Sequence, residues 1–75
     1  MNKARRKSIT NVMEQLESLK GEIESLKDEE EEYADNMPEN MQDSERHEAA
    51  DNAITNMEEA ISGIEEAIEN LESIE

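Results

Sequence analysis

The sequence predicts an all-α protein, an antiparallel two-helix hairpin that resembles a coiled coil and pairs into a four-helix bundle as a homodimer. Two long stretches carry apolar residues at alternating spacings of three and four, which is the pattern of a coiled-coil face. Between them lies Pro38, which cannot occupy a helix interior. A chain of 75 residues makes one small domain, so we expect a single hairpin over residues 1–75.

The first helix is expected from about residue 2 to residue 34. The apolar residues that predict its contact face, the seam, are Ile9, Val12, Leu16, Leu19, Ile23, Leu26, Tyr33 and Met37. Glu30 interrupts this series, and a carboxylate is costly to bury without a partner. We therefore expect the last turns of this helix to pack more loosely, or Glu30 to turn outward.

The turn is expected over residues 35–43. Pro38 also disfavours the helical conformation at Met37. Asn36 is a candidate cap for a short turn that contains Pro38. Ser44 is the predicted N-cap of the second helix, with Asp43 as the alternative.

The second helix is expected from residue 45 to about residue 73. Its seam residues form two heptad rows, a (Ile54, Ile61, Ile68) and d (Ala50, Met57, Ile64, Leu71). On one flank, the g positions are Ala53, Ala60, Ala67 and Ile74, and on the other the e positions are Asp51, Glu58, Glu65 and Glu72. Small residues let another helix approach closely, and the acidic flank favours a basic partner row.

The first helix supplies such a row at its own e positions, which include Lys20 and Lys27. Folding the chain near residue 40 predicts that Lys27 lies near Glu58 and Lys20 near Glu65. It also brings the basic residues 3–7 to the C-terminal end of the second helix, with Glu69, Glu72 and Glu75. A solvated face without specific pairs is the alternative for these lysines.

A two-helix hairpin leaves one side of each seam uncovered, and both apolar stripes are broader than a two-stranded coil needs. A homodimer is the expected solution, with a different partner protein as the alternative. Repulsion between two chains of net charge −15 opposes the dimer, so a marginal monomer is a third possibility. The residues predicted to carry self-association are Ile54, Met57, Ile61, Ile64, Ile68 and Leu71.

Charge is divided unequally along the chain. Residues 1–27 hold six of the seven Lys and Arg residues and four acids, whereas residues 28–75 hold 18 acids and a single base, Arg46. Such a negative surface repels nucleic acid and anionic membranes and attracts basic surfaces. No apolar run approaches the roughly 20 residues of a membrane span. The sequence therefore predicts a cytoplasmic protein with a basic protein as its partner and no direct contact with nucleic acid or membrane.

Residues suited to catalysis are scarce. The chain has no Cys, no Gly-rich phosphate loop and no HExxH or GxSxG motif, so we predict no enzyme activity, no catalytic residue and no cofactor. His47 is the single His. With Glu48 or Asp51 it would make a poor metal pair, so we expect a solvated side chain and no metal site.

The acids are the candidate binding residues. We predict a partner-binding acidic face made of Asp28, Glu29, Glu30, Glu31, Glu32, Glu58, Glu59, Glu65, Glu66, Glu69 and Glu72. Their recurrence about every seven residues, roughly 10 Å along a helix, is compatible with imitation of the charge of a nucleic-acid backbone. Solubility alone is the simpler explanation of such a face.

Two segments also resemble a known group of proteins. The start MNKARRKSI and the stretch DNMPENMQDSERHEAADNA at residues 35–53 are similar to small acidic helical proteins encoded by phages and prophages of Gram-positive bacteria. That group has no established activity or catalytic residues to transfer. The resemblance implies a phage gene product that acts in the cytoplasm of its host, where small acidic phage proteins often bind and disable host proteins.

The functional expectation follows from the charge and from the resemblance together. We expect a protein that binds and inhibits a basic host protein through its negative helical face, as a nucleic-acid mimic directed at a defence protein or a DNA- or RNA-binding protein. The alternative is a structural or assembly protein whose apolar stripe binds a second copy or a partner helix.

Overall fold

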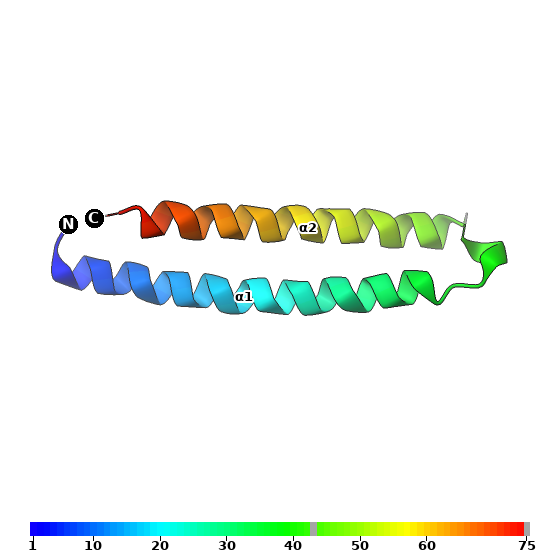
Figure 1. The fold of residues 1–75 in the computed structure, drawn as a ribbon, viewed down its shortest axis with the longest axis horizontal. Coiled ribbons are helices and arrows are strands. Elements are labelled where there is room, and N and C mark those ends of the chain that lie inside the picture. The colour runs from blue at the N-terminus through cyan, green and yellow to red at the C-terminus, as the bar shows by residue number, and fades with distance from the viewer. Residues whose placement is uncertain (43, 75) are drawn as a thin grey trace.

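The computed structural model describes residues 1–42 and 44–74 and shows a long antiparallel helical hairpin (Figure 1). Helix α1 spans Lys3–Asp35 and helix α2 spans Glu45–Glu72, with a short 3-10 helix, η1, at Glu39–Met41 between them. The helices lie side by side along their length, and both chain ends lie at the same end of the hairpin (Figure 1). The predicted hairpin is confirmed, with helix bounds within one residue of those expected.

Side-chain caps define where both helices begin. The Asn2 side chain accepts a hydrogen bond of 2.7 Å from the backbone N–H of Arg5. At the start of α2, the Ser44 hydroxyl accepts a bond of 3.3 Å from the N–H of His47 and donates one of 2.6 Å to the carbonyl of Met41. Each cap satisfies a backbone donor that the first helical turn leaves unpaired. Ser44 is thus the N-cap that the sequence predicted, and Asp43, the alternative, lies outside the described residues.

Replacing Ser44 with Ala is expected to lower the free energy of unfolding by about 1 kcal/mol, because the N–H of His47 loses its acceptor. Chemical denaturation followed by circular dichroism measures this change. Ser44→Asp keeps an acceptor at the same position and should unfold close to the wild type. Equal losses for the two variants would show that the cap does not stabilise α2.

The core between the helices is small. Within the described residues, the buried side chains are Ala34, Met37, Ala50, Ile61 and Ile68. Ala34 and Ala50 bring the helices close together near the turn, whereas the two isoleucines fill the middle and the far end. Met37, just before Pro38, closes the core at the turn, as its place in the first apolar series predicted.

The side of α1 that faces α2 differs from the prediction. Val12, Leu19, Leu26 and Tyr33 were expected in the seam, yet their exposed fractions are 45%, 51%, 54% and 48%. Helix α1 turns the other predicted seam row toward α2, together with a second row that was not predicted. One consists of the half-buried Ile9, Leu16, Ile23 and Glu30, and the other of Met13, Lys20, Lys27 and Ala34.

The physical reason for this rotation lies in the two lysines. Long lysine stems cover apolar surface while the ammonium groups stay in reach of carboxylates and water. Lys20 and Lys27 can therefore occupy a row beside α2, and a small residue, Ala34, continues that row at the closest approach. Glu30 is half-buried in the neighbouring row, so it does not turn fully outward.

Candidate functional site

An ion-pair cluster centred on Lys20 fixes how the two helices are aligned. The Nζ atom of Lys20 lies 3.7 Å from Glu17 Oε2 in its own helix and 3.9 Å from Glu65 Oε1 in α2. The expected pair between Lys20 and Glu65 is therefore present. Both carboxylates are more than half exposed, so each contact contributes at most about 1 kcal/mol. The value of the cluster is that it places residue 20 opposite residue 65.

The second expected cross-helix pair does not form. Lys27 Nζ lies 3.7 Å from Glu31 Oε1, one turn further along α1, and the described ion pairs include none between Lys27 and Glu58. The i to i+4 neighbour lies on the same helix face and is already within reach. Glu58 is consequently left without a basic neighbour from α1.

The acids of α2 occupy one side of that helix. Six carboxylates and no basic residue lie between residues 58 and 72, and all six residues are exposed. They fall at heptad positions b, e and f, which are contiguous around a helix. We call this surface the acidic face: Glu58, Glu59, Glu65, Glu66, Glu69 and Glu72. Among the described ion pairs, only Glu65 of this set has a cation, Lys20.

A shallow hollow lies within the acidic face. Its lining residues are Thr55, Glu58, Glu59, Ser62, Gly63 and Glu66. Gly63 leaves room there, because a Cβ added at that position would meet no atom within 4 Å. Three carboxylates therefore surround a concave patch of helix surface with hydroxyl groups beside it. This is the chemistry that a lysine or arginine side chain from a partner would fit.

The run from Asp28 to Glu32 does not extend the acidic face. Five consecutive residues wrap more than one full turn around a helix, so their side chains point in different directions. Glu30 and Glu31 are half-buried beside α2, while Asp28, Glu29 and Glu32 are exposed. The expected single face that combined this run with the α2 acids is thus divided over several sides of the hairpin.

Two acids that the sequence-based prediction omitted lie near the groove between the helices. Glu17 contacts Lys20 directly, and Glu24 occupies the same heptad position one repeat later, exposed to solvent. The signal was present in the sequence as the seven-residue spacing of Glu17, Glu24 and Glu31. Such a spacing puts all three on one side of α1.

The residues predicted to carry self-association are used within the hairpin. Ile61 and Ile68 are buried between α1 and α2, so they cannot contact a second chain. Ile54, Met57, Ile64 and Leu71 are half-buried. The a and d residues of α2 therefore pack mainly against α1, which belongs to the same chain.

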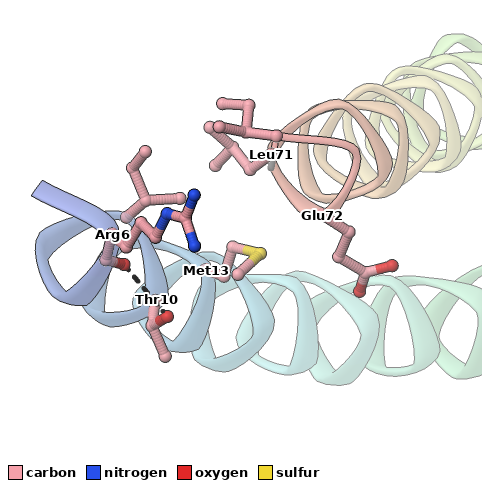
Figure 2. Close-up of a pocket in the computed structure, with 7 residues that line it drawn as sticks. Arg6, Thr10, Met13, Leu71 and Glu72 are labelled. Carbon is pink, nitrogen blue, oxygen red and sulfur yellow. Dashed lines mark hydrogen bonds between the residues drawn. The ribbon is translucent and has the colours of Figure 1, made fainter. Parts of the chain in front are cut away.

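The two chain ends meet in an open pocket of about 190 Å³ at the end of the hairpin opposite the turn (Figure 2). Arg6, Ile9 and Met13 of α1 and Leu71 and Glu72 of α2 are among its lining residues. Figure 2 shows Arg6 reaching from α1 toward α2, with its backbone carbonyl accepting a hydrogen bond of 3.1 Å from the Thr10 hydroxyl. Arg6, one of the basic residues 3–7, thus lies near the C-terminal end of α2 as expected, and Glu75 lies outside the described part of the chain.

His47 lies in the first turn of α2, with Nδ1 3.4 Å from Asp51 Oδ2. Over residues 1–42 and 44–74, no group of three or more His, Cys, Asp or Glu side chains is placed to hold a metal ion. In the same residues, neither helix combines the length and the apolar character that a membrane crossing requires.

Comparisons with known proteins identify no family or relative of this chain. No protein-family model matches the chain, and searches of curated proteins and of solved structures gave no significant match. The surfaces of the hairpin are therefore the features from which its function is inferred.

Proposed function

We propose that this protein binds a basic surface of another protein through the acidic face of α2 and blocks that surface. The observation that carries the proposal is the concentration of charge. Six carboxylates project from about four turns of helix, and only one of them has a cation among the described ion pairs. Like charges at this density repel each other, and a basic partner relieves that repulsion.

The hollow around Gly63 gives the acidic face a point of specificity. Glu58, Glu59 and Glu66 surround it, so a guanidinium or ammonium group placed there would be within reach of several carboxylate oxygens. The remaining acids, Glu65, Glu69 and Glu72, continue the negative surface toward the chain ends. One anchored cation with further basic residues alongside is the partner chemistry that this arrangement favours.

A nucleic-acid-binding protein is the class of partner that this chemistry fits best. Such proteins expose Lys and Arg side chains at positions that normally contact phosphates. A rigid helix with regularly repeated carboxylates would occupy the same groups and exclude the nucleic acid. The resemblance to small acidic phage proteins supplies the setting of this proposal, with a host defence protein or a DNA- or RNA-binding protein in the cytoplasm as the target.

The proposal is tested by competition. A labelled DNA duplex is bound to each member of a panel of basic DNA-binding proteins, and displacement by the hairpin is followed by fluorescence anisotropy. We expect displacement of the duplex from at least one member, with apparent affinity falling steeply from about 50 mM to about 200 mM salt. The triple variant Glu58→Gln, Glu59→Gln and Glu66→Gln should displace it about tenfold or more weakly, since three charge pairs are lost.

The matched control changes the same number of charges elsewhere. Glu14→Gln, Glu22→Gln and Glu24→Gln alter exposed acids of α1 and leave the acidic face intact, so this triple should displace the duplex nearly as well as the wild type. Equal losses in the two triples would mean that net charge alone acts. Failure of the wild type to displace the duplex from any member at the lower salt would refute the proposal.

A further inference from the structure

A row of large apolar side chains is exposed along the whole of α1. We call Val12, Leu19, Leu26 and Tyr33 the exposed row. Each is 45–54% accessible, and their seven-residue spacing places them on one line along the helix. A single exposed leucine needs no explanation, but an unbroken line of this kind marks an interaction surface.

The flank of α2 on the same side of the hairpin consists of small residues. The pair between Lys20 and Glu65 fixes the e positions of α2 on one side. The g positions must then lie on the opposite side, next to the exposed row. We call Ala53, Ala60 and Ala67 the alanine row. Ala60 is exposed, and the other two are half-buried.

The α2 half of this side of the hairpin carries no acidic residue at positions g and c. The residues of α2 that continue it beyond the alanine row are Asn56, Gly63 and Asn70, whereas the row of α1 beside the exposed row consists of Ser8, Gln15, Glu22 and Glu29. Every acid of α2 lies instead at position b, e or f. In a chain of net charge −15, the acids at the edge of the exposed row are therefore Glu22 and Glu29 of α1, and the alanine row itself has none.

The single hairpin has only a small hydrophobic core. Its described core contains five buried residues, of which two are alanines, and a domain of this size is only marginally stable even with a full core. Covering the exposed row would remove four large side chains from water. Burial of apolar side chains is the main favourable contribution to association, so covering these half-exposed residues would stabilise the hairpin.

We propose that the exposed row and the alanine row together bind a second copy of this chain, forming a four-helix bundle. Large side chains beside small ones make this face self-complementary, since a two-fold axis parallel to the helices sets the large row of each copy on the small row of the other. The hairpin measures 59 × 15 Å, so the outline of a whole long side, roughly 900 Å², is large enough for the 800 Å² per partner of a standard interface.

Charge favours a second copy over a foreign basic helix. The α2 half of the face has no carboxylate with which to attract a basic partner, and the two-fold axis sets this acid-free half of each copy against the exposed row of the other, with Glu22 and Glu29 at its edge. Both acidic faces then point away from the interface, which keeps the repulsion between the two chains low. The dimer would also display two acidic faces on opposite sides. Its formation is independent of whether the acidic face has a target.

Sedimentation equilibrium of the whole protein over a range of concentrations tests this inference. The wild type is expected to approach twice the chain mass of 8.6 kDa. The double variant Leu19→Glu with Leu26→Glu should dissociate about a hundredfold or more readily, since two carboxylates would be buried without partners. Its helix content should stay near that of the wild type, because both leucines are already exposed in the hairpin.

A second variant, on the other helix, tests the same interface even if the first variant fails to fold. Ala60→Glu adds one charge to the alanine row, and Ser62→Glu adds the same charge two residues away, on the side of α2 that carries the acids. Both residues are exposed. We expect the Ala60 variant to weaken the dimer at least tenfold and the Ser62 variant to remain dimeric. A wild-type mass of one chain at every concentration, or equal effects of the two substitutions, would overturn the inference.

Discussion

Shortening Ile68 to Ala is expected to lower the free energy of unfolding by about 2–4 kcal/mol. Ile68 is 6% exposed and is one of two large isoleucines in the described core. Removing three carbons there takes away buried apolar surface and leaves a gap between two helices that can close only in part. Since a domain of this size is stable by only a few kcal/mol, a large share of the variant should be unfolded at room temperature. Thermal melting followed by circular dichroism measures the loss.

Ile74→Ala is the matched control for this prediction. Ile74 is 42% exposed, just beyond the end of α2, so the same change in chemistry should cost less than about 1 kcal/mol. The contrast separates burial between the helices from the general hydrophobicity of the C-terminal segment. Similar melting temperatures for the two variants would contradict the placement of Ile68 in the core.

Helix α2 shows how far a heptad pattern can be interpreted without a structure. Its a and d rows are unbroken, and both face α1 as predicted, with Ile61 and Ile68 buried. Its N-cap is the predicted Ser44. These features depend on residues close together in the sequence, where periodicity and hydrogen-bonding chemistry act locally.

Helix α1 has an equally regular pattern, yet only one of its two predicted seam rows, that of Ile9, Leu16 and Ile23, faces α2. The spacing of Leu19 and Leu26 indicates an apolar stripe but not which helix covers it. A stripe wider than one partner can bury has two possible orientations, and Lys20 with Glu65 selects the one that leaves the leucines outside. That choice is made by contacts between distant residues, which a pattern along one helix does not contain.

The acidic face was predictable only in part, because spacing along one helix indicates which residues share a side but not what surrounds them. The acids of α2 share one side because of their spacing, and the structure keeps them there. The run at residues 28–32 was grouped with them by charge alone, although consecutive helical residues cannot share a side. Nothing in the sequence except the glycine itself indicated the hollow at Gly63, because the shape of the hollow depends on which side chains surround it.

Replacing Lys27 and Glu30 together by Leu is expected to stabilise the hairpin by about 2 kcal/mol and raise its melting temperature by about 10 °C. Both residues are half-buried in rows of α1 that face α2. Lys27 pairs only with Glu31 of its own helix among the described contacts, so the substitution gives up a weak ion pair. Two leucines would extend the apolar contact from Ile23 toward Ala34. Thermal and chemical denaturation both measure the gain.

Lys7→Leu with Glu14→Leu is the control, because it removes the same two charges from exposed positions of α1. Leucine, lysine and glutamate have similar helix propensities, so the control should change stability by less than about 0.5 kcal/mol. A gain confined to the first pair would show that charged residues occupy the rows against α2 while leucines remain outside. Such an exchange sacrifices stability of the single hairpin, and it is the arrangement expected of a helix whose leucines are kept for a second chain. Equal melting temperatures for the two double variants would remove that argument.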